Sequence, residues 1–281
     1  SWGIEGDGAA ITITAGFTDP YVFKFGEYDS ATGFGQSTKF FIKGIEFVGN
    51  GTIGHANTTI FESKYTATAD VNKGTSNTTT ACIGAINVIP SSYIEKTDIR
   101  LFNKGVVAKW GFGLAYQSGS IQYCNEGISV TQGFTNLKLD KSLEIELCAF
   151  GVTLFQGDDS VVDAIIESNS CGIALYSSKF FECTSWLEGN TVDVVLRAIN
   201  TASFNRHIHF FNGVGPSTID SNGGLVEFSM RNSASGSSYS FGVSTNERFD
   251  NILFENNDYD ASSDGFDSVS YTHLTLPTNR E

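Results

Sequence analysis

A pattern that repeats about every 22 residues runs through the middle of the chain, and such a repeat constrains the fold more than any other sequence feature. Four ten-residue segments align without gaps: 99–108, 121–130, 145–154 and 166–175. In each segment an isoleucine precedes a glycine by six residues, and valine or isoleucine follows that glycine directly; the glycines are Gly105, Gly127, Gly151 and Gly172. A fifth copy fits loosely at 192–200, with Ala198 in place of the glycine, and weaker matches surround Gly51 and Gly84.

Apolar residues alternate on either side of each glycine, which is the period of a β-strand. We expect each glycine to allow a sharp bend between two short strands. A unit this small cannot bury its own apolar face, so it must stack on its neighbours. The signature of leucine-rich repeats is absent from the sequence, and helical repeats need longer units. The sequence therefore predicts an all-β fold, a single-stranded parallel β-helix (a solenoid) with coils of about 21–26 residues stacked about 4.8 Å apart.

The same coil pattern, I-x-x-x-x-x-G-[IV]-x-[VL], resembles the repeat of right-handed parallel β-helices of the pectin-lyase type, which include phage tailspikes. The segment FFIKGIEFVGNG (40–51) resembles the first coil after the N-terminal cap in those proteins. The resemblance covers roughly residues 38–200. It implies a right-handed solenoid and, for tailspikes, a homotrimer. It leaves the function open, because that fold supports hydrolases, lyases, epimerases and non-enzymatic spikes.

This resemblance divides the chain into four parts. Residues 1–37 are expected to form an N-terminal cap or the first irregular coils, and 38–200 the parallel β-helix. A long polar loop is expected at 55–80, either as a binding loop or as a solvated insertion. Residues 201–268 are expected to form irregular final coils or lateral strands. The last residues, 269–281, resemble a translated sequencing adapter and are set aside as a non-native tail.

Composition excludes two classes of partner. Seventeen Lys and Arg against 31 Asp and Glu give a net charge of −14, which argues against a nucleic-acid-binding surface. No apolar run approaches the roughly 20 residues that span a bilayer, so no membrane insertion is expected. Five cysteines lack the spacing of a disulfide framework. Cys124 and Cys148 share one repeat position and should stack in adjacent coils; a disulfide fits that separation, but a row of buried free thiols is favoured.

One column of outward-facing side chains suggests chemistry. Five residues before each glycine the column contains Arg100, Gln122, Glu146, Glu167 and, from the loose fifth copy, Asp193, with Glu46 at the same place upstream. Stacking would place the carboxylates of Glu146 and Glu167 about 5 Å apart, and those of Glu146 and Asp193 about twice as far. These separations overlap the ranges for retaining and inverting glycoside hydrolases, and close like charges raise a pKa. The alternative is a solvated polar face.

A second acidic candidate is Gly157-Asp158-Asp159, which resembles the Gly-Asp-Asp element of polygalacturonase-like β-helix hydrolases, whose paired Asp residues activate water and protonate the leaving group. The other motifs of that family are missing, so Asp158 and Asp159 are retained as acidic groups on a loop edge. No metal site and no cofactor are expected. The spacing of Asp258, Asp260, Asp264 and Asp267 only distantly resembles a calcium loop, because the terminal Glu is absent.

Aromatic residues give a third indication. Trp110, Tyr116 and Trp186 are candidate platforms for sugar rings, with packing against the core as the alternative. Together these features favour a phage tail spike or fibre protein of the virion that binds a bacterial surface polysaccharide. In the enzymatic form of this hypothesis, the protein also depolymerises that polysaccharide. Two alternatives remain: a secreted, extracellular polysaccharide hydrolase or lyase that uses carboxylates, and a non-enzymatic adhesin or structural spacer.

Overall fold

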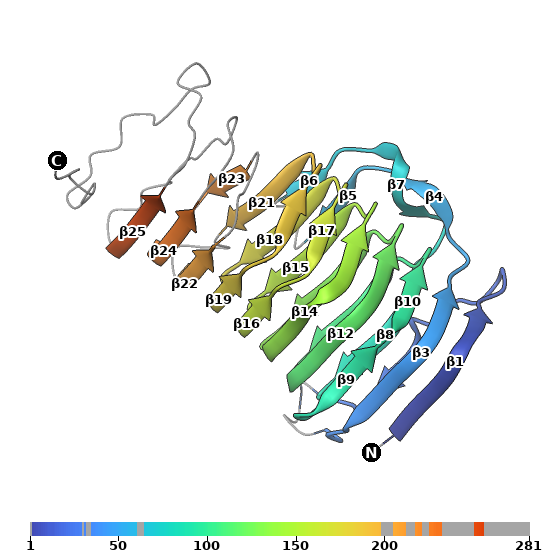
Figure 1. Ribbon diagram of the computed structural model, residues 1–281. Coiled ribbons are helices and arrows are strands. Elements are labelled where there is room, and N and C mark those ends of the chain that lie inside the picture. The colour runs from blue at the N-terminus through green and yellow to red at the C-terminus, as the bar shows by residue number, and fades with distance from the viewer. Residues whose placement is uncertain are drawn as a thin grey trace, which may run out of the picture.

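The chain forms a parallel β-solenoid of about five turns, as the computed structural model in Figure 1 shows. The structure describes residues 2–29, 31, 35–60, 65–197, 205–211, 217–220, 225–231 and 250–255. All the regular secondary structure among these residues is β-strand. The all-β solenoid predicted from the repeat is therefore confirmed.

Two parallel sheets make up the walls of the solenoid. Sheet A contains β1 (Trp2–Thr12), β3 (Phe40–Val48), β9 (Ser92–Glu95), β10 (Thr97–Arg100), β12 (Phe112–Gln122), β14 (Thr135–Glu146), β16 (Asp158–Val162), β17 (Ile165–Glu167), β19 (Lys179–Cys183), β20 (Trp186–Glu188), β22 (Asn205–Phe210), β24 (Leu225–Arg231) and β25 (Asp250–Glu255). Sheet B contains β2 (Tyr21–Phe25), β8 (Ala81–Ile86), β11 (Lys104–Lys109), β13 (Glu126–Thr131), β15 (Phe150–Phe155), β18 (Cys171–Tyr176), β21 (Val192–Arg197) and β23 (Ser217–Asp220).

The strand register confirms the alignment of the four main repeats. In sheet B, the residues directly after the four glycines, Val106, Ile128, Val152 and Ile173, lie opposite one another on successive strands. The loose fifth copy was placed wrongly. Val194 continues this row, so Asp193, and not Ala198, occupies the glycine position. The upstream match at Gly84 is also two residues out of phase, because Gly84 pairs with Val107.

The glycines of the repeat serve a purpose other than the predicted bend. None of the four has a left-handed backbone conformation; that conformation lies four residues earlier, at Leu101, Tyr123, Leu147 and Ser168. What the glycine position requires is space for the next coil. A Cβ on Gly127 would lie 2.6 Å from the carbonyl oxygen of Gly151, and the other three glycines meet a carbonyl at similar distances. A side chain there would push adjacent coils apart.

The interior is a continuous apolar column. Inward-facing side chains of both sheets pack into one cluster that runs from Ile13 to Phe210. The interior also contains a stack of buried polar or thiol side chains at one repeat position: Cys124, Cys148, Asn169 and Asn190. The amide of Asn169 donates to the carbonyl of Ile145 and to Asn190 Oδ1, both at 3.0 Å, so this ladder supplies its own hydrogen bonds. All five cysteines are free and buried, and for Cys124 and Cys148 this agrees with the predicted row of buried thiols.

The segment after Gly51 folds into a strap that crosses several coils. It contains two antiparallel pairs, β4 (Thr52–His55) with β7 (Asp70–Ser76) and β5 (Thr58–Ile60) with β6 (Tyr65–Ala67), which follow one edge of the solenoid in Figure 1. The strap is fastened to three consecutive turns of the corner between the sheets. Thr75 N donates to Asn125 Oδ1 at 3.2 Å, Gly74 N to Leu147 O at 2.7 Å, and Lys73 Nζ to Asn169 O at 3.3 Å.

Candidate functional site

Carboxylates line the outer face of sheet A where its strands end. The register places Gln122, Glu146, Glu167 and Glu188 opposite one another on β12, β14, β17 and β20. We call Glu146, Glu167 and Glu188 the acidic row. The predicted column is therefore correct from Arg100 to Glu167, and its next member is Glu188, which the sequence analysis missed. The spacing of 21 residues between Glu167 and Glu188, equal to the preceding glycine spacing, could have identified it.

Asp193 does not belong to the acidic row, so its predicted alignment is wrong. It lies in β21 of sheet B, is buried, and accepts a hydrogen bond from Asn190 Nδ2 at 2.9 Å. Glu46 is also displaced, because it pairs with Asp98 and not with Arg100. The Arg100 guanidinium nevertheless reaches it at 2.9 Å. Arg100 therefore forms its ion pair with Glu46. None of the ion pairs among the described residues involves a member of the acidic row.

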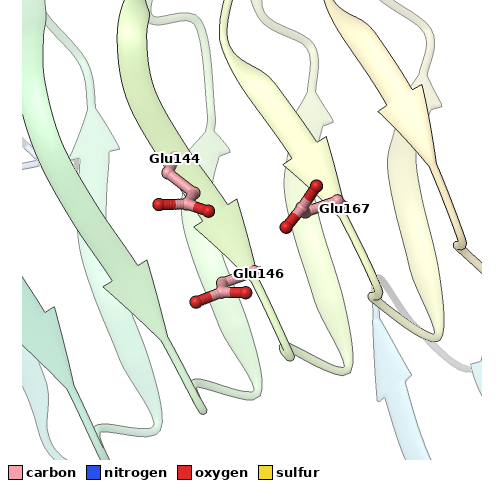
Figure 2. Close-up of side chains that lie close together, drawn as sticks. All are labelled: Glu144, Glu146 and Glu167. Atoms are coloured by element: carbon pink, nitrogen blue, oxygen red, sulfur yellow. The ribbon is translucent and has the colours of Figure 1, made fainter.

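Glu144, Glu146 and Glu167 form a close cluster at the end of β14 and on β17 (Figure 2). Each half-buried side chain offers one oxygen, and these oxygens all lie within 4.8 Å of one another. Partial burial, together with the charges of Glu144 and Glu167, raises the pKa of Glu146, although a hydrogen bond of 2.5 Å from Gln122 Nε2 acts in the opposite direction. Chemically, the cluster can accept hydrogen bonds from hydroxyl or ammonium groups, hold a proton, or offer oxygen ligands of the kind Ca²⁺ prefers.

A second row, which contains two apolar side chains, runs beside the acidic one. Glu144, Ile165 and Trp186 lie opposite one another on β14, β17 and β20. Ile165 is 37% exposed and Trp186 is 62% exposed. The indole Nε1 of Trp186 donates to Glu188 Oε2 at 2.7 Å, which ties the ring to the acidic row. The two rows give this part of sheet A an aromatic face directly beside hydrogen-bond acceptors.

The two other predicted aromatic platforms lie elsewhere. Tyr116 is buried inside the solenoid and its hydroxyl donates to Thr97 O at 2.6 Å, so the prediction of an exposed ring is wrong. Trp110 is half-buried in the turn between β11 and β12. Its ring packs on Tyr28, with ring centroids 4.7 Å apart, and Lys109 Nζ lies 5.5 Å from the ring. Neither residue joins Trp186.

Asp158 and Asp159 lie at the opposite end of the strands of sheet A. Asp158 pairs with Thr135, the first residue of β14, whereas Glu146 is the last residue of that strand. The two acidic sites are thus separated by roughly 30 Å along the strand and cannot act on one bond. Burial raises the pKa of Asp158, while Lys179 counteracts this effect. The calcium-like segment from Asp258 to Asp267 lies outside the described residues.

Comparison with protein-family models, with curated proteins and with solved structures found no match for this chain. The described residues include no helix long and apolar enough to cross a membrane. The geometry of sheet A is therefore the basis for assigning a function.

Proposed function

We propose that this chain is the polysaccharide-binding solenoid of a phage tail spike or fibre, which binds a bacterial surface polysaccharide on the outer face of sheet A. The observation that carries this proposal is the exposed indole of Trp186 beside the acidic row. A sugar ring has an apolar face that stacks on an aromatic ring and a rim of hydroxyl groups that donate to carboxylates. Trp186 and the acidic row supply both partners on one rigid surface.

Three further properties agree with a virion protein. The solenoid offers an extended, regular surface in which equivalent residues recur about every 4.8 Å, a geometry suited to a polymeric ligand. The five free thiols fit assembly in a reducing cytosol. The coil pattern resembles that of tailspikes, and for this reason we include a homotrimer in the proposal. Light scattering should then give three chain masses; a monomer would favour the secreted enzyme or the adhesin.

The binding proposal predicts that Trp186→Ala weakens polysaccharide binding at least about fivefold, because stacking on an aromatic ring contributes about 1–3 kcal/mol by analogy with base stacking. Binding can be measured by isothermal titration calorimetry on a panel of bacterial surface glycans. Trp2→Ala is a matched control, since Trp2 is also an exposed tryptophan, at 73%, but lies on β1 at the other end of the solenoid. Equal binding by the two variants would contradict the proposal.

A second candidate function is cleavage of the bound polysaccharide, favoured by the raised pKa of Glu146 next to Glu167. A carboxyl group with a raised pKa can protonate a leaving group, and a second carboxylate close by can act as the nucleophile of a retaining glycosidase. In this arrangement Glu146 is the acid and Glu167 the nucleophile.

The cleavage hypothesis predicts that Glu146→Gln and Glu167→Gln each abolish release of new reducing ends while preserving binding. Because Glu146 must be protonated, activity should fall as pH rises through its raised pKa. Glu46→Gln is the control, as Glu46 is also a glutamate of sheet A but pairs with Arg100 outside the acidic row. Unchanged release in the two variants would limit the function to binding.

A further inference from the structure

A hollow lies on the outer face of sheet A, at the end of the sheet where Asp158 lies. It is a groove of about 420 Å³ lined by Asp159, Val161, Phe180, Glu182 and His209. These residues come from β16, β19 and β22, three strands that pair directly. Glu182 and His209 lie opposite each other in register, and Glu182 is likewise opposite Val161. The volume falls within the range of small-molecule sites, about 300–1,000 Å³.

Phe180 is the unusual member of this groove. Its ring is 53% exposed, and its backbone has a φ of 52°. It continues a row of left-handed residues across sheet A, at the equivalent positions of β12, β14 and β16: Gly113, Asn136 and Asp159. Glycine, asparagine and aspartate tolerate this conformation, whereas a bulky aromatic residue does so only with strain. Bulky residues such as Tyr123 and Leu147 adopt the same conformation at the corners of the solenoid, and Phe180 differs from them because its side chain is 53% exposed and lines a groove.

The charge around the ring indicates which ligand fits. Asp159, on the neighbouring strand β16, and Glu182, two residues after Phe180 on β19, are exposed carboxylates, and both line the groove. Lys179, the cation next to Phe180 in the sequence, interacts with Asp158, which is not a lining residue. The groove thus combines an aromatic face, two anionic acceptors and the imidazole of His209 opposite Glu182, and its carboxylates are complementary to a ring that carries an ammonium group.

We propose that this groove is a subsite for one amino-sugar unit with a protonated amine. Phe180 would stack on the apolar face of the sugar, and Asp159 and Glu182 would accept hydrogen bonds from its ammonium and hydroxyl groups. The inference rests on the proposed polysaccharide-binding function and specifies its ligand class. Phe180 and Trp186 lie six residues apart on consecutive strands, at most about 20 Å, so one polysaccharide chain can occupy both positions.

The test uses the full chain and three soluble probes: a glucosamine oligomer, its N-acetylated counterpart and a neutral glucose oligomer of the same length. Calorimetry should show the tightest binding for the glucosamine oligomer, with an affinity that falls as salt concentration rises. Phe180→Asn should weaken that binding about tenfold while leaving the melting temperature unchanged or higher, because asparagine is better suited to the left-handed position. Phe112→Asn is the matched control, since Phe112 is 47% exposed on β12, outside the groove.

The outcomes separate this inference from the proposed function. If Trp186→Ala removes binding and Phe180→Asn does not, the polysaccharide-binding proposal stands and the groove proposal is wrong. If the neutral oligomer binds as tightly as the glucosamine oligomer, the amino-sugar class is wrong. If none of the three oligomers and none of the panel glycans binds, the proposed function itself fails. Glu182→Gln serves as a second variant that leaves the strand backbone unchanged and should also weaken binding of the glucosamine oligomer.

Discussion

Among individual residues, the ion pair of the half-buried Lys104 and the buried Glu126 has the clearest energetic consequence. Their side chains face each other on β11 and β13, with Nζ and Oε1 2.6 Å apart, and Thr153 Oγ1 donates to the other carboxylate oxygen at 2.7 Å. Burial by itself raises the pKa of Glu126. The Lys104 ammonium and the hydrogen bonds from Lys104, Ser129 and Thr153 outweigh that effect, so the pKa lies below its ordinary value of 4.5.

We expect Glu126→Gln to reduce the free energy of unfolding by about 2 kcal/mol at neutral pH, less than for a fully buried pair because Lys104 is 29% exposed. The folded-state pKa is lowered, so this stabilisation is complete above pH 4.5 and is lost as pH falls through the folded-state pKa. Denaturant titrations at pH 7 and pH 3 measure both effects. The double variant Lys104→Met with Glu126→Leu should restore stability, and a loss independent of pH would contradict the electrostatic explanation.

The positions of individual residues were predictable only where inward-facing and outward-facing residues alternate without interruption from the repeat glycine. Glu146 and Glu167 follow the glycine repeat directly and were found. Tyr116 was misplaced because the turn between β11 and β12, with the left-handed Trp110, interrupts the alternation that starts at Gly105, and a tyrosine suits an exposed or a buried position. Glu188 was missed because the fifth repeat was anchored on Ala198, although an aspartate occupies the glycine position there.

At the level of the coil, the glycine column determines how closely strands of sheet B stack. A Cβ on Gly151 would lie 2.7 Å from Gly172 O, 3.1 Å from Ile166 Cγ2 and 3.3 Å from Asn169 Nδ2. The first of these contacts is with backbone, which cannot move without shifting the neighbouring coil. The sequence indicates that this column needs a small residue. The expected reason was a bend in the backbone, but in the structure the reason is the close contact between neighbouring coils.

Gly151→Ala should therefore reduce the free energy of unfolding by about 2 kcal/mol, within the range for overpacked sites. Gly157→Ala is the control. The nearest atoms to a Cβ there belong to the side chains of Val130, at 3.0 Å, and Leu154, at 3.2 Å, which can adjust, so its loss should be smaller. Chemical denaturation of both variants provides the comparison. Equal losses would show that the Gly172 carbonyl contact is not the cause.

For the molecule as a whole, the solenoid architecture followed from the sequence because one repeat unit, once phased, determines all of its neighbours. The strap did not, since the segment from Thr52 to Ser76 is polar and carries no repeat. Its position is set by hydrogen bonds to the corners of separate coils, such as Gly74 N to Leu147 O. Such contacts join residues far apart in sequence, and no local pattern encodes them.

Stacking also determines how the molecule opens. Each coil contacts only its neighbours, so opening should begin at an end of the solenoid and not in its middle. Cys82 lies in β8, next to β2, the terminal strand of sheet B. Cys148 lies deeper in the stack, two residues before β15 and next to Leu147, to which the strap is fastened. Burial raises the pKa of both thiols, so neither reacts appreciably until its coil opens.

Iodoacetamide should therefore label Cys82 at least tenfold faster than Cys148 in native buffer, as measured by mass spectrometry of the labelled peptides over time. The control is the chain in guanidinium chloride, where burial is lost and both cysteines should be labelled at similar rates. Faster labelling of Cys82 in the native state then reports end-first opening, because intrinsic reactivity is the same in the unfolded chain. Equal native rates for the two thiols would mean that the strap and the stacked coils open together as one cooperative unit, contrary to nearest-neighbour coupling.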